Sequence, residues 1–187
     1  MFLALPVVTE RLVLRPFTIE DLDAVHAYQR LPEVARYMLW EPRDREQVSA
    51  VVAQMATETT LDADGDCLCL AVVRDGTVIG QVEVVRRSAE QGELGYVFNP
   101  AHQGRGFATE AARAMLHVGF GHGMREIIAR CSAGNDASAN LMRRLGMRQS
   151  GTGRGFVKGE WRDELTFAIT RTAAGAPPSP ARPGPRR

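Results

Sequence analysis

The sequence contains little cysteine and no long apolar run. Its three cysteines, Cys67, Cys69 and Cys131, form neither a CxxC pair nor a zinc-ligand spacing, which argues against a disulfide framework and a zinc module. No apolar run approaches the ~20 residues of a membrane span. The first residues, MFLALPVVTERL, lack the basic start and the apolar length of a signal peptide. These absences predict a cytoplasmic protein with no part in the membrane.

The chain also lacks an excess of charge of either sign. Its formal net charge is +1 at pH 7, and this balance gives no reason to expect a nucleic-acid partner. The histidines have no spacing typical of metal ligands. They are His26, His102, His117 and His122. We therefore expect a function without nucleic acid and without a metal ion.

The end of the chain has almost no large apolar residue. Residues 173–187, AAGAPPSPARPGPRR, are rich in proline and arginine, and such a segment cannot bury enough surface to offset the entropy lost on ordering. We predict a disordered tail, and a solvated tail is favoured over a PxxP ligand at residues 180–183. Residues 1–172 have the length of one domain with a sizeable core.

Residues 1–172 show both the alternation typical of strands and the spacing typical of helices. Asp75-Gly76 is typical of a hairpin turn between two strands, and Pro32 suits the first turn of a helix. The mixture predicts an α+β fold with a mixed sheet. The expected strands are 11–15, 67–74, 77–86, 94–98, 126–131, 148–157 and 164–170; the expected helices run from the Thr18 cap to Pro32 and over 32–37, 43–58, 108 to about 119, and 137–145.

A glycine turn follows the expected strand at 94–98. Asn99-Pro100 ends that strand, because proline cannot donate to a ladder. Residues 103–108, QGRGFA, then lead directly into a helix pattern. Free N–H groups at a helix start suit a phosphate or pyrophosphate, although an isolated GxG is also typical of an ordinary turn. A P-loop is excluded because no Gly-Lys-Ser/Thr follows, and a dinucleotide fingerprint is poor because Thr109 stands at its third glycine.

The order of the motifs resembles the GNAT superfamily of acyl-CoA-dependent N-acetyltransferases. Gln103-x-x-Gly106-x-Ala108 is similar to its (Arg/Gln)-x-x-Gly-x-(Gly/Ala) signature. Residues 135–138, NDAS, and Leu145-Gly146 resemble its next block. Residues 9–16, TERLVLRP, resemble the start of the branch that includes the ribosomal-protein alanine N-acetyltransferases. The resemblance extends from about Thr9 to Thr170. It implies a seven-stranded mixed sheet flanked by helices and splayed between its fourth and fifth strands, with CoA in the gap.

The resemblance also implies which residues bind acetyl-CoA. Backbone N–H groups of the glycine turn would hold the pyrophosphate, and one strand would pair with the pantetheine amides. Asn135 and Ser138 would contact the CoA arm, but both residue types are also typical of a helix start. Arg105 is equally well explained as a solvated arginine. The implied cofactor residues are Tyr96, Val97, Phe98, Gln103, Gly104, Arg105, Gly106, Phe107, Ala108, Thr109, Asn135 and Ser138.

Acetyl transfer from a thioester needs no covalent nucleophile, only positioning and removal of a proton from the amine. Glu93 matches the family's Glu-x-Gly-Tyr pattern and is the expected base. Glu83 is the second candidate, on the strand face opposite Val82 and Val84; either carboxylate is also explained as a solvated strand residue. Tyr37 and Trp40, with Glu83, are the expected acceptor-binding residues.

The sequence departs from the family at the residue that many members use as an acid. That position, seven residues after Asn135, holds Met142 instead of tyrosine, and methionine cannot donate a proton. Ser138, or a water that it orients, is the expected substitute.

The leading prediction is an acetyl-CoA-dependent N-acetyltransferase that acts by direct attack in a ternary complex. Its acceptor is a protein N-terminus or a small-molecule amine, and the protein is a monomer or a homodimer. Met142 supports one alternative, a weak or inactive acyl-CoA-binding sensor or scaffold. A nucleotide-binding protein is disfavoured because the glycine turn lacks a P-loop lysine.

Overall fold

The computed structural model describes residues 5–172, so the tail expected at 173–187 lies outside the described residues. The strands are β1 (Val7–Val8), β2 (Val13–Pro16), β3 (Cys67–Arg74), β4 (Thr77–Arg86), β5 (Gln91–Phe98), β6 (Glu126–Ser132), β7 (Arg148–Val157) and β8 (Glu160–Thr170). The helices are α1 (Leu22–Gln29), α2 (Pro32–Ala35), α3 (Arg45–Met55), α4 (Phe107–Gly121) and α5 (Asp136–Arg144), with 3-10 turns η1 (Ile19–Asp21) and η2 (Pro100–His102).

The strands form one mixed sheet in the order β1-β2-β3-β4-β5-β6-β8-β7. All neighbours are antiparallel except β5 and β6, which are parallel. The sheet has eight strands where seven were expected. The additional strand is β1, in which Val7 pairs with Leu14 and Val8 pairs with Val13. Two residues are too few to show a strand periodicity, so β1 could not be predicted from its residues.

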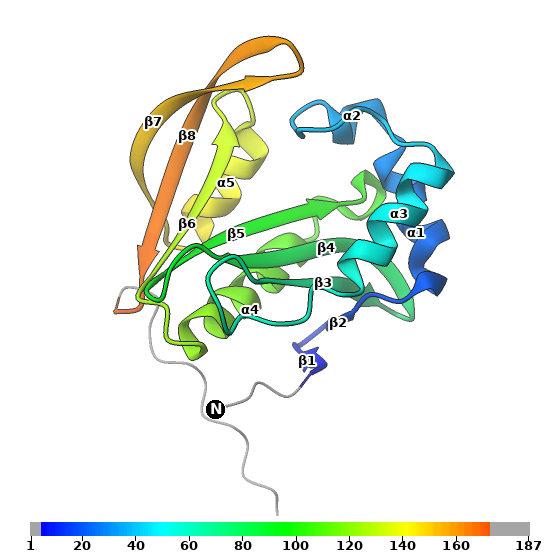
Figure 1. Ribbon diagram of the computed structural model, residues 1–187, viewed down its shortest axis with the longest axis horizontal. Coiled ribbons are helices and arrows are strands. Elements are labelled where there is room, and N and C mark those ends of the chain that lie inside the picture. Colours follow the sequence, from blue (N-terminus) through cyan, green and yellow to red (C-terminus); the bar gives the residue numbers. More distant parts are fainter. Residues whose placement is uncertain (1–4, 173–187) are drawn as a thin grey trace, which may run out of the picture.

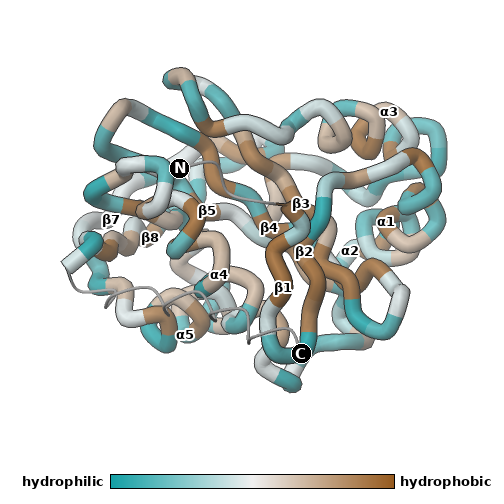
Figure 2. The backbone as a smooth tube through the Cα atoms, turned by 90° about the horizontal axis from the view of Figure 1, so that it is seen from below, coloured by the Kyte–Doolittle hydropathy of each residue, from teal (hydrophilic) through white to brown (hydrophobic). Residues whose placement is uncertain are grey.

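Helices cover both faces of the sheet. Successive side chains of a strand point to opposite faces: Leu68 and Leu70 of β3 belong to the core beneath α4, whereas Cys69 and Ala71 belong to the core beneath α1 and α3. A strand that is buried on both faces is apolar throughout, which explains the run CLCLAVV at 67–73. Figure 2 shows these hydrophobic central strands between the two helical layers.

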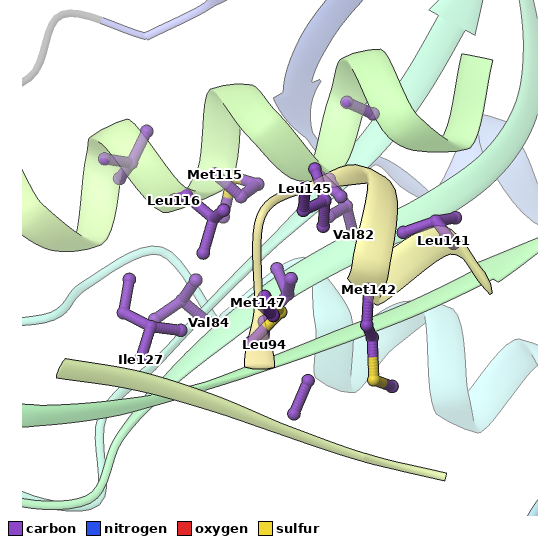
Figure 3. Close-up of a cluster of buried hydrophobic side chains, with 14 of the residues drawn as sticks. Val82, Val84, Leu94, Met115, Leu116, Ile127, Leu141, Met142, Leu145 and Met147 are labelled. Atoms are coloured by element: carbon purple, nitrogen blue, oxygen red, sulfur yellow. The ribbon is translucent and has the colours of Figure 1, made fainter. Parts of the chain in front are cut away.

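The core beneath α4 also fixes α5. Figure 3 shows side chains of α4, α5 and the strands converging there. Met142 is only 1% exposed and lies in this core, so the residue at the family's tyrosine position contributes to packing. Burying a side chain of this size contributes ~1.5–3 kcal/mol to folding.

The sheet splays between β5 and β6. The two strands pair only at Gln91–Glu126, Gly92–Ile127 and Glu93–Ile128, and beyond these pairs they diverge (Figure 1). On its other side, β5 stays paired with β4 as far as Phe98. Residues 94–98 therefore leave one backbone edge of β5 unpaired with β6, and this edge faces the gap that was predicted between the central strands.

Candidate active site

The glycine turn ends at the start of α4. Gly104 and Gly106 have left-handed φ values of 76° and 81°, which glycine adopts without a Cβ clash. The first hydrogen bond of α4 runs from the Glu110 N–H to the Gly106 carbonyl at 3.0 Å. The N–H groups of residues 107–109 therefore have no partner within the helix. Together with the positive end of the helix dipole, they form a site for an anion.

The segment before β2 holds this turn in place. Thr9 Oγ1 donates to Glu110 Oε1 at 2.6 Å, and Arg11 Nε donates to Glu110 Oε2 at 2.7 Å. Arg11 Nη1 also donates to the Arg105 carbonyl at 3.0 Å. Burial alone would raise the pKa of Glu110, but the hydrogen bonds and the charge of Arg11 outweigh it and lower the pKa. These contacts give the TER motif at residues 9–11 a physical role, which is to fix the first turn of α4.

A pocket of about 720 Å³ lies beside the glycine turn, a volume within the usual range for ligand sites. The open edge of β5, the start of α5 and α2 complete its lining. The structure brings nearly all the predicted cofactor residues into this pocket, together with the predicted acceptor residue Tyr37. These lining residues are Tyr37, Tyr96, Val97, Phe98, Gln103, Gly104, Gly106, Phe107, Ala108, Thr109, Asn135 and Ser138.

Two hydroxyl groups meet in the pocket. Tyr96 Oη and Ser138 Oγ are 2.8 Å apart, and both residues line the pocket. Burial raises the pKa of Tyr96 to about 12, although the hydrogen bond with Ser138 opposes the rise. The phenol therefore stays protonated at neutral pH and is available as a donor. From the sequence, only the backbone of Tyr96 was expected to contact the cofactor, so the position of its hydroxyl group in the pocket was not predicted.

Asn135 caps α5 and also lines the pocket. Its Oδ1 accepts a hydrogen bond from the Ser138 N–H at 3.1 Å, as the cap interpretation predicted. The carboxamide NH₂ is a separate donor that this cap does not use. Capping and contact with a ligand are therefore compatible for Asn135.

The segment around α2 closes one end of the pocket. Tyr37 Oη donates to the Gly134 carbonyl at 3.1 Å, across the gap. Lys158 Nζ and Arg162 Nη1, from the β7–β8 hairpin, donate to the carbonyls of Ala35 and Arg36 at 2.9 and 2.8 Å. These bonds connect α2 with the elements on the far side of the splayed gap.

Four predicted residues lie outside the pocket, and two of them are Arg105 and Trp40. Arg105 is exposed and does not line the pocket; its carbonyl serves as the acceptor for Arg11. Trp40 packs against the core beneath α1 and α3, with the Arg43 guanidinium 4.5 Å from the centroid of its ring. Trp40 therefore has the packing role that is common for aromatic residues.

The two candidate bases differ in their surroundings, and neither lines the pocket. Glu93 is ion-paired, with its Oε2 2.8 Å from Arg87 Nε and its Oε1 3.8 Å from Arg130 Nη1. Glu83 lies on the same face of the sheet, where burial and then the charge of Glu58 raise its pKa. The role of each carboxylate stays a prediction, as does the absence of a metal.

Some lining residues were not anticipated from the sequence. Arg144 lines the pocket and places its Nε 3.5 Å from Thr109 Oγ1 at the start of α4. Basic residues are common in the last turn of a helix, so its position gave no sign of a ligand contact. The other unanticipated lining residues are Glu33, Val34, Met38, Pro100, His102, Ala137 and Leu141.

Known proteins share this sequence pattern and fold. Residues 11–148 match the family model described as Acetyltransferase (GNAT) domain. The uncharacterized N-acetyltransferase YnaD of Bacillus subtilis (strain 168) is 33% identical over 172 residues, which is 87% of this chain and 95% of that one. A GNAT-family acetyltransferase structure from Bacillus anthracis has a TM-score of 0.79 at 29% identity, over 89% of this chain and 98% of that one.

A structure of RimL, a ribosomal L7/L12 alpha-N-protein acetyltransferase, in complex with coenzyme A has a TM-score of 0.75 at 18% identity. The match covers 89% of this chain and 98% of that chain. At this identity the likeness shows a shared fold. Among residues 5–172, no helix combines the length and the apolar composition that a membrane crossing requires.

Proposed function

Since this chain belongs to the GNAT acetyltransferase family and is an N-acetyltransferase, we propose that it transfers acetyl from acetyl-CoA to a primary amine by direct attack in a ternary complex. The observation that carries this proposal is the single pocket that joins the glycine turn, the open edge of β5 and the start of α5. These three elements supply anion-binding N–H groups, unpaired strand backbone and side-chain donors, which match the pyrophosphate, the pantetheine amides and the thioester end of acetyl-CoA.

In the proposed complex, the pyrophosphate binds at residues 103–109 and Arg144 adds a cation beside it. The pantetheine lies along residues 96–98 as an added strand, because backbone amides there lack a partner on β6. The thioester then lies near the Tyr96–Ser138 hydroxyl pair. This arrangement uses every predicted cofactor residue that lines the pocket except Asn135, whose carboxamide NH₂ is a further donor for the CoA arm.

The reaction forms a C–N bond and breaks a C–S bond. The neutral amine attacks the thioester carbonyl, the amine proton passes to a carboxylate or a water, and the CoA sulfur leaves as a thiolate. An alkyl amine has a pKa near ~10 and is mostly protonated at neutral pH, so a group that removes its proton accelerates the reaction.

Tyr96 and Ser138 are the proposed donors to the departing thiolate. The 2.8 Å contact holds the two hydroxyl groups together, so they can stabilise the thiolate by hydrogen bonding, while its proton comes from the amine nitrogen, directly or through water. This pair takes the place of the tyrosine that Met142 replaces in the sequence. Because Met142 is buried in the core, it has no part in this step.

The acceptor is proposed to enter at the α2 end of the pocket, where Tyr37, Glu33 and Met38 lie. A protein N-terminus and a small amine are both open. The fold shared with RimL, whose substrate is a protein N-terminus by its description, supports the first. The acidic side chain of Glu33 at this end supports the second, because it would attract a protonated amine.

The proposal is tested by the release of CoA thiol from acetyl-CoA. Spermidine represents the small amines, and a short peptide with a free N-terminus represents the protein acceptors; the same peptide with a blocked N-terminus is the control. We expect thiol release with at least one free amine and none with the blocked peptide. Thiol release that is independent of any amine would contradict amine transfer.

The alternative is an acyl-CoA-binding sensor without chemistry, which the methionine at position 142 favours. It predicts that acetyl-CoA raises the melting temperature while no amine of the panel releases thiol. Substituting Ser138 with Ala separates the two: under the proposed function turnover falls, and under the alternative there is no turnover to lose.

A further inference from the structure

Gly95 leaves room for a side chain from the neighbouring strand. On the face beneath α1 and α3, β5 presents Glu93, Gly95 and Val97 in succession, and Glu83 of β4 is the direct cross-strand partner of Gly95. A Cβ at position 95 would lie 2.6 Å from Glu83 Oε1 and 2.9 Å from Glu83 Cγ. The Glu83 side chain thus extends across β5 into the space that residue 95 would otherwise fill.

The effect of a larger residue at position 95 would be steric and would fall on the Glu83 side chain. Gly95 does not have a positive φ, so any residue could adopt its backbone conformation. A methyl group at this position has to displace the carboxylate, because contacts under 3.0 Å are not observed for real Cβ atoms. Position 95 therefore controls where the Glu83 carboxylate lies.

The carboxylate lies at the point where the sheet opens. The last pair between β5 and β6 is Glu93–Ile128, and Val97 lines the pocket. Gly95 lies between them, and two residues of strand span only ~6.6 Å. Glu83 is thus the carboxylate that covers the first unpaired residues of β5 on the face opposite α4.

Its surroundings differ from those of Glu93. An oxygen of Glu83, an oxygen of Glu58 and the Sγ of Cys67 all lie within 4.8 Å of one another. Glu83 has no ion pair among residues 5–172, whereas Glu93 is paired with Arg87 and Arg130. The charge of Glu93 is therefore compensated by arginines, whereas no ion pair among the described residues neutralises the partly buried Glu83 carboxylate.

We propose that Glu83 binds the acceptor ammonium and takes its proton, and that Gly95 is the positioning residue that lets its carboxylate reach the open edge of β5. This inference rests on the proposed function and names the base within it. One proton leaves the ammonium nitrogen and becomes bound to the Glu83 carboxylate, and the neutral amine then attacks the thioester carbonyl. As the C–S bond breaks, the nitrogen loses a second proton, which passes to the departing CoA thiolate. The acceptor is thereby a protonated amine, which enters from the α2 side.

The first experiment compares carboxylate variants, with spermidine or the free peptide as acceptor, whichever releases thiol faster. Glu83→Gln should lower kcat by ~10²-fold or more, the usual scale for a general base, with the KM for acetyl-CoA unchanged. Glu93→Gln should lower kcat by less than ~10-fold. Glu90→Gln, which changes an exposed carboxylate just before the start of β5, is the matched control and should match the wild type.

The positioning role is tested by Gly95→Ala. The added methyl group should lower kcat ~10-fold or more by moving the carboxylate, again without changing the KM for acetyl-CoA. The added substitution Glu83→Asp, which shortens the side chain by one methylene, should restore part of the lost kcat. A Gly95→Ala variant with wild-type kcat would overturn the positioning role.

The pH profile supplies a readout that a purely structural role would not move. The acidic limb of kcat/KM for the acceptor reports the base in the free enzyme. Because the negative charge of Glu58 raises the pKa of Glu83, Glu58→Gln should shift this limb to lower pH. The groups that face Glu83 from the packed elements are Glu58, Cys67, Cys69, Arg87 and Glu93, and the other four are unchanged in this variant.

The outcomes separate this inference from the proposed function. Wild-type transfer with a normal Glu83→Gln variant overturns the role of Glu83 alone, and a selective loss in Glu93→Gln would assign the base to Glu93 instead. Failure of the wild type with every amine of the panel would overturn both proposals. A thermal shift with acetyl-CoA in each variant verifies that it is folded.

Discussion

At the scale of single residues, Glu83 is a carboxylate whose position opposes folding. Burial and Glu58 raise its pKa, so the folded state binds the proton more tightly than the unfolded chain does. The stability linked to this group is fully present below the unfolded pKa of ~4.3 and is lost as pH rises through the higher folded pKa. At neutral to alkaline pH, therefore, the ionised side chain destabilises the fold.

Glu83→Gln should consequently stabilise the protein while it lowers turnover. We expect the free energy of unfolding to rise by about 1 kcal/mol at pH 8, which corresponds to ~2–4 °C in Tm for a domain of this size. This gain in stability should shrink toward pH 4. Thermal unfolding between pH 4 and 8 measures it, with Glu90→Gln as the control. A variant that is less stable than the wild type at pH 8 would contradict this account.

The pKa of Asp21 is shifted in the opposite direction to the pKa of Glu83. Its two oxygens accept hydrogen bonds from Arg15 Nη1 and Nη2, each at 2.7 Å, and from the Thr18 N–H at 2.9 Å. Burial alone would raise the pKa of Asp21, but these donors outweigh it and lower the pKa. The stability from this pair is therefore present above the unfolded pKa of ~3.9 and is lost as pH falls through the lower folded pKa.

Asp21→Asn should lower the free energy of unfolding by about 2 kcal/mol at pH 7. This loss is smaller than the loss expected for a fully buried ion pair, because the Arg15 side chain is 32% exposed. The difference from the wild type should shrink progressively as pH falls below ~3.9. Asp23→Asn is the matched control, since the Asp23 side chain is 79% exposed in its pair with Arg45 and should cost less than ~0.5 kcal/mol. Equal losses in the two variants, measured by urea unfolding, would refute this prediction.

Single residues also show where a sequence stops being informative. Asn135 and Ser138 could be placed at the pocket because their motif fixes them at the start of α5. Glu93 matched a motif equally well, yet its neighbours Arg87 and Arg130 come from outside that motif, and only the folded sheet brings them to its carboxylate. The role of Gly95 could not be predicted from the sequence either, because it depends on the side chain of Glu83, which comes from another strand.

At the scale of elements, the turn before α4 combines conformation with ligand contact. Gly106→Val should abolish the stabilisation by acetyl-CoA, because a branched side chain both disfavours the φ of 81° and occupies the approach of the pyrophosphate. A thermal shift titration measures it.

The matched control for this turn is Gly76→Val. Gly76 has a φ of 77° in the β3–β4 hairpin, with nothing within 4 Å of its added Cβ. The Gly76→Val variant should lose a similar amount of stability as Gly106→Val but should still be stabilised by acetyl-CoA. If Gly106→Val binds acetyl-CoA normally, the turn does not hold the pyrophosphate.

Elements were predictable where the local pattern was strong. The bounds of β3 and β4 agree with the sequence-based ranges because alternation and the Asp75-Gly76 turn specify them. The helix expected at 43–58 is limited to Arg45–Met55, since Asp44 Oδ1 accepts from the Gln47 N–H at 2.8 Å and fixes the start. The position of α2 across the gap depends on contacts with the distant β7–β8 hairpin, which no local pattern encodes.

At the scale of the whole molecule, the splay divides the sheet into two parts with few direct connections. Only three residue pairs join β5 to β6, and packing of α4 and α5 in one core supplies much of the rest. The contacts of Tyr37 with Gly134 and of Ala35 in α2 with the β7–β8 hairpin form a second connection at the open end. A ligand that spans the pocket would touch elements of both parts.

Acetyl-CoA should therefore stabilise the molecule and slow hydrogen exchange on both sides of the gap. At 100 times its dissociation constant, a ligand that binds only the folded state adds about 2.7 kcal/mol. We expect slower amide exchange in residues 94–98 and in the first turn of α4, because their free N–H groups become bonded, and in the first turn of α5. Residues of α1 and α3, on the far side of the β3–β4 hairpin, serve as the internal reference and should change little. Hydrogen–deuterium exchange with acetyl-CoA, with ATP as the comparison, measures these effects. Equal protection by ATP, or protection confined to α4, would show that the ligand does not extend along the open edge of β5.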